Sequence, residues 1–381
     1  MEKKDESCRN KEHFGHLSLL QFMRIRSDMY LGGHIGDGTH FDDGIYQMIK
    51  FVVDLAINNC KTNGEIKIDG GTVMTIGIKV RYYGKGLPHD DLLERCTAEK
   101  LEEWSYLTLV NALSSRFEIR SYCSKKVRTL KFFRGILKSD DIQDTSEEDG
   151  TYIFFIPDDI IFNVYGDHCD EDILNNMIQN YAYLNMGVSF CLNGKLYRSR
   201  NGLLDFLSNT MKSTPLYPII HMVGKDIEIA FTHTNQDGEV YYSFVNGHYT
   251  RYDGTHLEAF KDSFTHMMYQ RYKTYDKEIL NGIVAAISIK IEDPVYETAS
   301  PMRLASILMG PKRETIDDYV GNFLENNLVP YLKEHKEDCT NILEKRKRLG
   351  ITVFQPRLKV CTFARTNYYE YGKQRQVQES P

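Results

Sequence analysis

The hydrophobic pattern first becomes regular after residue 42. In the segment DDGIYQMIKFVVDLAINNC, apolar side chains recur three and four residues apart, which is the spacing of one helix face. Asp42 or Asp43 can cap the start of this helix with a side-chain oxygen. Strand-like runs follow, and Gly70-Gly71 predicts a tight turn between the first two. The strands are expected at 65–69, 73–82, 117–121, 127–134 and 152–156, and two further helices at 101–113 and 170–186.

The second half of the chain repeats this mixture of strands and helices. The pattern predicts strands at 226–232, 239–245 and 283–291, and helices at 256–272 and 316–348. Asn235-Gln236-Asp237-Gly238 predicts a turn, and Pro330 is expected to kink or split the last helix because it lacks an N–H. We therefore expect an α+β protein with a mobile charged arm over 1–16, one unit over 17–205, a second over 206–349 and a polar tail over 350–381.

Composition places the chain among ordinary globular proteins. It includes 47 basic and 53 acidic side chains, and 41% of its residues are hydrophobic, as is usual for a globular chain. Its length of 381 residues predicts two or three domains. The net charge of -6 disfavours a protein that coats nucleic acid, although it allows a local basic patch. No apolar run approaches the ~18–20 residues of a membrane span, and the polar N-terminus is unlike a signal peptide. We expect a cytoplasmic protein without a membrane partner.

Neither the cysteines nor the histidines are spaced like a metal site. The eight cysteines are scattered, and none forms a CxxC pair. His233, His248, His256 and His266 share no helix face. No Ser/His/Asp or Cys/His arrangement has a spacing that favours nucleophilic catalysis. We expect no metal ligands and no catalytic residue of these kinds.

Several local strings nevertheless follow one another in an informative order. A basic helix ends at Arg24-Ile25-Arg26, and the strings that follow it are D-M-Y-L-G from Asp28, Y-G-K-G-L-P from Tyr83, V-N-A-L-S from Val110, G-T from Gly150 with Phe155, Pro157 and Asp158, S-F-V-N-G from Ser243, G-T-H from Gly254, and D-P-V-Y-E from Asp293. Together they resemble the N-terminal region of the B subunits of type II DNA topoisomerases, namely those of gyrase and topoisomerase IV. The similarity is greatest to topoisomerase IV B subunits of the Bacteroides group, particularly over 218–244.

This resemblance implies a GHKL (Bergerat-type) α/β sandwich followed by a ribosomal-S5-like transducer domain. In the family, the B subunit continues into a metal-binding domain that helps to cleave DNA. A chain that ends about 30 residues beyond the basic cluster at 344–348 is therefore expected to be unable to cut or reseal DNA alone.

The resemblance also assigns the positions that bind nucleotide in the family, and here they carry other side chains. The carboxylate that acts as general base corresponds to Phe51, and the Asn that binds Mg²⁺ corresponds to Leu55. Shifting the alignment by one residue, to Lys50 or Asp54, does not restore a Glu-x-x-x-Asn pair. The Asp that accepts a hydrogen bond from adenine corresponds to Tyr82, whose ring is expected to fill the space of the base.

Two further elements of the family's site are altered. The glycine-rich lid corresponds to 89–110, which is short, acidic and free of glycine. The lysine of the transducer's Q-T-K loop corresponds most nearly to Pro301, with Arg303 as a neighbouring cation. Changes in four elements of one site, namely the Phe51 and Leu55 pair, Tyr82, the lid and the Q-T-K loop, predict a pseudo-ATPase without catalytic residues, ATP or Mg²⁺. Weak nucleotide binding through Gly84, Gly86 and Thr151 remains the alternative. The degenerate pocket then comprises Phe51, Asp54, Leu55, Tyr82, Gly84, Gly86, Thr151 and Arg303.

Basic residues late in the chain are candidate DNA contacts, with the alternative that they simply complement a helix dipole. They are Lys312, Arg313, Lys345, Arg346, Lys347 and Arg348. The sequence thus leads to three hypotheses. The first is a non-catalytic partner of topoisomerase IV or gyrase subunits. The second is an ATP-hydrolysing topoisomerase component, and the third is a protein that only binds DNA. Homodimerisation is compatible with each.

Overall fold

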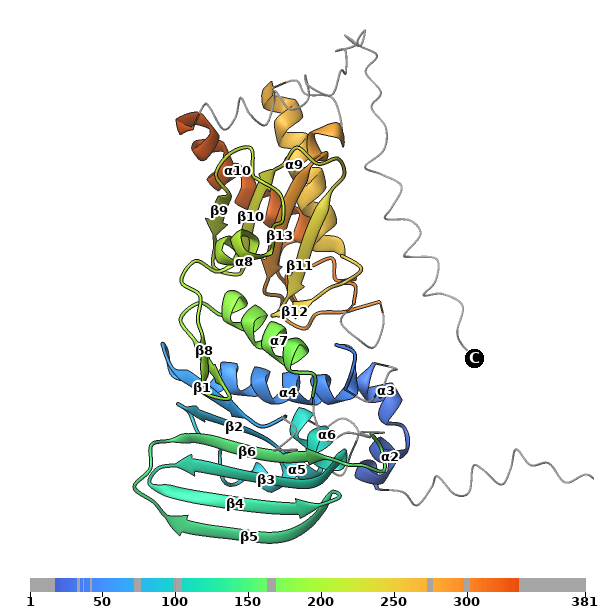
Figure 1. Cartoon of the computed structure of the whole chain (residues 1–381), viewed down its shortest axis with the longest axis vertical. Helices are drawn as coiled ribbons and strands as arrows, with labels where there is room; N and C mark the ends of the chain where they lie inside the picture. Colours follow the sequence, from blue (N-terminus) through green and yellow to red (C-terminus); the bar gives the residue numbers. More distant parts are fainter. Residues whose placement is uncertain are drawn as a thin grey trace, which may run out of the picture.

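Helix α4 (Gly44–Asn59) forms where the pattern predicts it and is the central helix of the first unit. The computed structural model describes residues 18–335 apart from 33–34, 37, 42, 72–76, 99, 101–104, 163–168, 273–276 and 298–301. The expected arm over 1–16 and tail over 350–381 lie outside these residues. Within them, two α+β units are stacked along the long axis of the molecule (Figure 1).

The first unit is built on an eight-stranded sheet with the order β5-β4-β3-β6-β2-β1-β7-β8. All neighbouring strands are antiparallel except β1 and β7, which run parallel. The strands are β1 (Glu65–Asp69), β2 (Ile78–Tyr83), β3 (Ser114–Cys123), β4 (Lys126–Phe133), β5 (Ile136–Asp144), β6 (Gly150–Pro157), β7 (Ser189–Leu192) and β8 (Lys195–Tyr197).

Helices α4 and α7 (Glu171–Leu184) lie between this sheet and the second unit (Figure 1). The other helices of the first unit are α2 (Leu19–Ile25), α3 (Ser27–Leu31), α5 (Leu92–Thr97) and α6 (Tyr106–Ala112). Helix α4 packs on β1, β2 and β6, and α7 packs on β7 and β8. The buried face of α4, which includes Met48, Ile49, Val52 and Val53, joins the main apolar cluster of the unit.

The second unit contains a five-stranded sheet with the order β12-β11-β13-β10-β9. Its elements are α8 (Leu203–Thr210), β9 (Ile220–Val223), β10 (Ile227–His233), β11 (Val240–Val245), β12 (His248–Tyr249), α9 (Thr255–Tyr272), the 3₁₀ helix η2 (Lys277–Leu280), β13 (Ile283–Ile289) and α10 (Ile316–Glu334). Helix α9 connects β11 and β12 to β13, which is parallel to β11, as a crossover between parallel strands requires.

Both faces of the second sheet are covered. Helices α9 and α10 pack together against one face, while α8 packs on the other against β9, β10 and β13. Strand β10 is consequently buried at all seven positions. Tyr183 at the end of α7 packs with Phe206 of α8 and Phe244 of β11 in one apolar cluster, so the two units share buried surface.

Several predicted boundaries are wrong. Strand β2 begins at Ile78, so the connection after β1 is longer than a two-residue Gly70-Gly71 turn, although β1 and β2 do pair antiparallel. Helix α6 begins only at Tyr106. Helix α10 runs through Pro330 to Glu334 without splitting. Pro330 is exposed, so water can satisfy the backbone group that it leaves unpaired, while buried neighbours hold the helix on the core.

Candidate functional site

The two α4 positions that the family resemblance assigns to general base and Mg²⁺ ligand lie one helical turn apart. Phe51 and Leu55 are both half-buried and pack against the apolar cluster of the first unit. A phenyl ring and an isobutyl group can neither take up a proton nor coordinate a hard cation, which requires oxygen ligands. This face of α4 therefore offers packing surface where the family needs oxygen donors.

Phe51 is stacked on an aromatic ring from a distant part of the chain. The ring of Tyr106, the first residue of α6, lies parallel to it, with 4.3 Å between ring centroids and an interplanar angle of 5°. Burial, with a smaller contribution from the negative charge of Asp54, raises the pKa of Tyr106 above its usual value. The space beside the general-base position is thus occupied by a second side chain of the protein.

Contacts between α5 and α6, in the segment that the family resemblance aligns with the lid, hold Tyr106 in this position. The Ser105 and Thr108 hydroxyls both donate to the Arg95 carbonyl in α5, at 2.7 and 2.8 Å. Asn111, the Asn of the V-N-A-L-S string, donates from Nδ2 to the Cys96 carbonyl at 2.9 Å. These contacts fix α6 against α5, and α6 also packs on α4. Helix α5 lies within this segment, and the helix predicted over 101–113 is observed as α6, while residues 99 and 101–104 lie outside the described residues.

Tyr82, at the position of the adenine-binding Asp, is buried within the sheet. It lies on β2 directly opposite Thr151 of β6. The Tyr82 side chain is 1% exposed and Thr151 is 0% exposed, and neither hydroxyl has a hydrogen-bond partner of good geometry. Burial raises the pKa of Tyr82 to about 12, although Thr151 partly opposes this rise. Two polar atoms at this position are thus buried without the partner that each would normally have.

The glycines of the Y-G-K-G-L-P string are required by contacts within the protein. A Cβ on Gly84 would lie 2.3 Å from the carbonyl oxygen of Asn59, and one on Gly86 would lie 2.1 Å from that of Tyr122. Gly84 also adopts a φ of +153°, which side-chain-bearing residues rarely adopt. Both glycines therefore have a structural reason to be present that does not involve a nucleotide.

Asp54 makes its contacts with α7 and the second unit. Its Oδ1 accepts a hydrogen bond from the Tyr181 hydroxyl at 2.8 Å, and its Oδ2 lies 3.2 Å from His248 Nε2. Burial and the neighbouring Asp54 carboxylate together raise the pKa of Tyr181 well above its usual value. Tyr296, also in the second unit, has its pKa raised to about 12 by burial and then by Tyr106 and Asp54. The Asp54 carboxylate thus links the two units.

Arg303, the cation nearest the Q-T-K position, pairs with acidic residues of its own unit. Its guanidinium contacts Glu297 at 2.9 Å and Glu258 at 2.6 Å, and it also donates to the Tyr252 carbonyl at 2.9 Å. Residues 298–301, which include Pro301, lie outside the described residues. The guanidinium therefore has three partners within the second unit.

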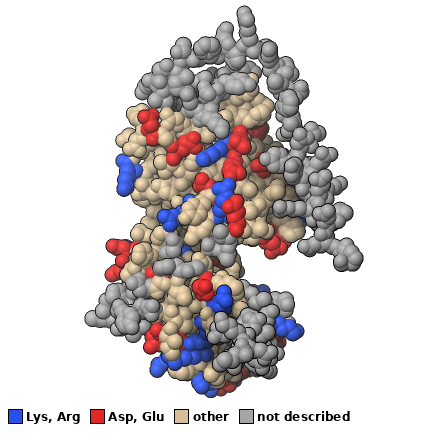
Figure 2. All heavy atoms as spheres, turned by 90° about the vertical axis from the view of Figure 1, so that its right-hand side faces the viewer, with Lys and Arg blue, Asp and Glu red and all other residues tan. Residues whose placement is uncertain are grey.

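The candidate DNA contacts are only partly described, because 345–348 lie outside the described residues. Arg313 pairs with Asp226 at 2.9 Å and lies over the Tyr319 ring, while Lys312 is exposed. Figure 2 shows Lys and Arg side chains on the second unit lying beside Asp and Glu side chains on the face that it draws. Over the described residues of that face, positive charge is interspersed with negative charge.

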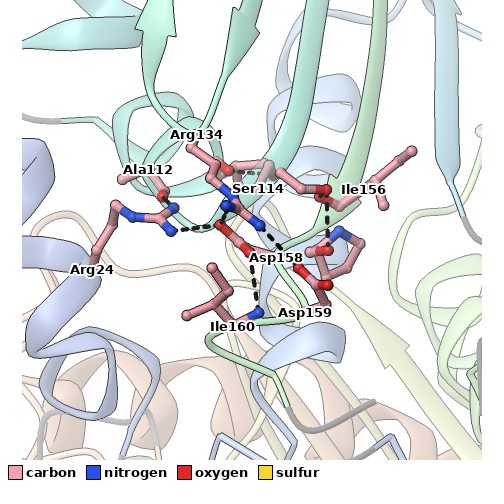
Figure 3. A network of polar contacts seen from close by, with 11 residues as sticks. Arg24, Ala112, Ser114, Arg134, Ile156, Asp158, Asp159 and Ile160 are labelled. Carbon is pink, nitrogen blue, oxygen red and sulfur yellow. Dashed lines mark hydrogen bonds and ion pairs between the residues drawn. The ribbon is translucent and has the colours of Figure 1, made fainter. Parts of the chain in front are cut away.

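A buried ion-pair network, which no sequence pattern predicted, joins the N-terminal helix to the end of the sheet. Arg24 Nη2 contacts Asp158 Oδ2 at 2.5 Å, and Arg134 Nε lies 3.1 Å from the same oxygen (Figure 3). Arg24 also donates to the Ala112 carbonyl at the end of α6, at 2.6 Å. Burial alone would raise the pKa of Asp158, but the Arg24 guanidinium and the Ile160 N–H lower it below its usual value.

Another polar cluster is enclosed in the second unit. Ser243 Oγ lies 2.6 Å from His256 Nε2 and 2.5 Å from Thr250 Oγ1, and all three residues are buried. His256 Nδ1 has no partner, so no acid completes a catalytic triad. Among the described residues there is no group of three or more His, Cys, Asp or Glu side chains that could hold a metal ion. No described helix is both long and apolar enough to cross a membrane.

Comparison with known proteins identifies solved structures whose fold resembles that of this chain. Residues 202–349 match the sequence model of the DNA gyrase B family. The structure resembles the 43K ATPase domain of Thermus thermophilus gyrase B with a TM-score of 0.70 and 21% identity, covering 87% of this chain and 95% of that one. It also resembles the ATPase region of Saccharomyces cerevisiae topoisomerase II, with a TM-score of 0.63 and 17% identity over 86% and 100% of the two chains. The chain has the fold of a gyrase B ATPase region.

Sequence comparison also finds relatives among the type II topoisomerase B subunits. The B subunit of DNA topoisomerase 4 from Borreliella burgdorferi is 35% identical over 379 aligned positions, which cover 91% of this chain and 62% of the relative. The DNA gyrase B subunit from Streptococcus pyogenes is 24% identical over 75% of this chain and 50% of its own length. The chain therefore resembles the ATPase region of these B subunits and spans 50% to 62% of the length of these two relatives.

Proposed function

We propose that this chain is a non-catalytic relative of type II topoisomerase B subunits that acts by associating with topoisomerase IV or gyrase subunits. On this proposal it hydrolyses no ATP and requires neither ATP nor Mg²⁺. The observation that carries the proposal is the stack of Phe51 on Tyr106 at the position of the family's general base.

The residues present do not fit a bound ATP–Mg²⁺ complex. Phe51 and Leu55 supply no oxygen atom, and Tyr82 supplies a buried ring in place of a carboxylate. Arg303 is held by Glu297 and Glu258. The glycines that the family would use near the nucleotide lie against backbone carbonyls of this protein. Each of these features favours a site that is closed by the protein's own side chains.

Retention of the two-unit fold supports a binding role. A protein that keeps this scaffold but lacks the groups for hydrolysis can still present the surfaces through which such subunits associate. The similarity to Bacteroides-group topoisomerase IV B subunits, inferred from 218–244, belongs to this proposal. So does a division of the chain close to residue 205, at the start of α8 (Leu203–Thr210). Binding of DNA through 345–348 and homodimerisation are further parts of it.

Purified subunits provide the direct test. The full chain is mixed at micromolar concentration with each topoisomerase IV and gyrase subunit of the same cell, and complexes are measured by sedimentation velocity. The proposal predicts a defined complex with at least one of them and a change in the relaxation or supercoiling rate of the assembled enzyme. If none of them forms a complex at micromolar concentration, the binding role is wrong.

An ATP-hydrolysing component is the second candidate, and the buried, unpartnered hydroxyls of Tyr82 and Thr151 favour it. A base displacing the Tyr82 ring would give these atoms partners. The measurement is ATP hydrolysis by the pure chain with and without DNA, compared between the native protein and Thr151→Val. Turnover that the substitution removes would establish this candidate, whereas the proposal expects none in either protein.

A further inference from the structure

A cavity of about 430 Å³ lies between the two units. Helices α4 and α7 form one side of it, and the β11–β12 turn and Met302 form the other. Figure 1 shows α7 lying between α4 and β12 at this junction. Phe51, Leu55 and Tyr82, which stand at nucleotide positions of the family, are not among its lining residues. The volume of the cavity falls in the range of small-molecule sites, which often occur where two domains meet.

Aromatic and sulfur-containing side chains from both units form much of the lining. Tyr181 and Phe244 are 4% and 2% exposed, and the Tyr249 ring lies beside that of Phe244, with 5.5 Å between ring centroids. Met177 and Met302 have flexible side chains that can adapt to the shape of a ligand. Such a lining is suited to a flat aromatic molecule.

The charged side chains of the lining already interact with other groups of the protein. His248 Nε2 lies 3.2 Å from the Asp54 carboxylate. The Arg251 guanidinium lies 5.5 Å from the centre of the Phe41 ring, and Lys50 also has an interaction within the protein. A charged ligand would lose hydration on entering the cavity and would have to compete with these interactions. The lining therefore favours a neutral ligand.

Three side-chain carboxamides of the lining are available for hydrogen bonding. Asn176 and Asn180 lie one turn apart on α7, and Gln47 lies on α4. None of the three carboxamides is hydrogen-bonded to a described residue, and those of Gln47 and Asn180 are half-buried. A carboxamide presents an N–H donor and a C=O acceptor side by side. It can therefore pair with a ring that carries an acceptor next to a donor.

We propose that this cavity binds a neutral, flat heteroaromatic molecule with a lactam edge, which is a ring N–H beside a ring carbonyl. The ring lies among the aromatic and methionine side chains, and the lactam pairs with a half-buried carboxamide, that of Gln47 or Asn180. Because the two units supply opposite walls, a bound molecule contacts both and stabilises their present arrangement. This binding does not depend on whether the chain binds ATP.

Isothermal titration calorimetry of the full chain with isoquinolin-1(2H)-one, a neutral bicyclic lactam, tests the site. One molecule is expected to bind per chain. The analogue 2-methylisoquinolin-1(2H)-one keeps the rings and the carbonyl but lacks the N–H donor, and its affinity is expected to be at least about five-fold lower. Isoquinoline-1-carboxylate, an anion of similar size, is expected to bind no more tightly than the lactam.

Substitutions in the lining test the hydrogen bond and the cavity separately. At least one of Gln47→Leu and Asn180→Leu should weaken lactam binding about five-fold, and in that variant the lactam and its N-methyl analogue should bind within about two-fold of each other. Met177→Trp, which fills the cavity, should weaken lactam binding more than about ten-fold. Asn326→Leu, at an exposed position on α10, is the matched control and should leave the affinity unchanged.

Circular dichroism and thermal unfolding establish that each variant is folded. The proposal is overturned if the lactam shows no saturable binding, if the N-methyl analogue binds as tightly, or if neither carboxamide variant weakens binding. It is also overturned if the carboxylate binds more tightly than the lactam, or if the folded Met177→Trp variant binds the lactam as the native protein does. If Met177→Trp does not fold, the two carboxamide variants still decide.

Discussion

The two units use their family motifs in different ways. In the second unit, motif residues bind one another and their neighbours: Ser243 contacts His256, and Asn246 forms two hydrogen bonds with the Ile291 backbone at 2.8 and 2.9 Å. In the first unit, the positions that would touch a nucleotide carry Phe51 and Leu55, which pack on the core.

A contrast between retained and replaced motif residues also appears within the first unit. Gly84 and Gly86 match the family string, and each lies against a backbone carbonyl where a Cβ would collide. Arg24 and Asp158 also match family strings, and they form the buried ion pair of Figure 3. The retained residues Gly84, Gly86, Arg24 and Asp158 thus have contacts inside the protein, whereas Phe51 and Leu55, which the family resemblance aligns with the general base and the Mg²⁺ ligand, are apolar.

The largest expected effect comes from breaking the retained network. Asp158→Asn leaves the Arg24 and Arg134 guanidiniums without their shared carboxylate, and Asp158 is fully buried. We expect the free energy of unfolding to fall by about 3 kcal/mol. Urea unfolding measures it. Asp159→Asn removes an adjacent carboxylate that is 82% exposed and should change stability by less than about 0.5 kcal/mol. Equal losses in the free energy of unfolding for the two variants would show that the buried carboxylate contributes no more to stability than the exposed one.

Restoring the family's carboxylate should be harmful here. Phe51→Glu removes the stack on Tyr106 and places a charge against the apolar cluster. We expect a loss of about 2 to 3 kcal/mol in the free energy of unfolding without any gain in ATP hydrolysis. Phe51→Leu keeps an apolar group and should cost about 1 kcal/mol. A stable Phe51→Glu variant would contradict the packing role of this position.

The motif histidine of the second unit predicts a pH dependence. Burial lowers the pKa of His256 from 6.5 to about 3. Between these values the unfolded chain binds a proton at this site and the folded chain does not, so the free energy of unfolding falls as the pH falls below 6.5. The contribution is about 1.4 kcal/mol per pH unit, or about 2 kcal/mol at pH 5.

His256→Asn should remove this part of the pH dependence between pH 7 and pH 5, measured by urea unfolding. His266→Asn, at an exposed position on α9, should leave the pH dependence of the free energy of unfolding unchanged. An unchanged slope in His256→Asn would contradict the burial of a neutral imidazole.

The smallest effect is expected at the cation near the Q-T-K position. The Arg303 side chain is 35% exposed, and its partners Glu258 and Glu297 are more than half exposed. Arg303→Met should therefore cost less than about 1 kcal/mol and should not alter any response to nucleotide. Arg271→Met, which breaks a similar surface pair with Glu325, is the control. A selective loss of nucleotide response in Arg303→Met would indicate that the cation serves the site.

The longest helix of the first unit and its first strand are predicted from the sequence, whereas an exposed strand and several short elements (β7, α8 and β9) are not. Helix α4 and strand β1 form where the pattern predicts them, because apolar residues recur on the face of each that packs on the core. Strand β5 is not predicted, because all nine of its residues are exposed and its sequence carries no alternation between a buried and an exposed face.

The substitutions at Phe51, Leu55 and Tyr82 can be assigned from family strings, but their contacts cannot. Phe51 meets Tyr106 from another helix, and Asp54 meets His248 from the other unit. Both contacts join segments that are far apart in the chain, and neither follows from local periodicity. The cavity between the units has the same origin, since its walls come from both halves of the sequence.

Calorimetric titration of the full chain with ATP and Mg²⁺ tests the central claim most directly. We expect no saturable heat at millimolar nucleotide, because Phe51 and Tyr82 stand at positions that the family resemblance assigns to nucleotide binding, and Tyr106 stacks on Phe51. Binding of one ATP per chain with submillimolar affinity, weakened by Thr151→Val, would contradict it.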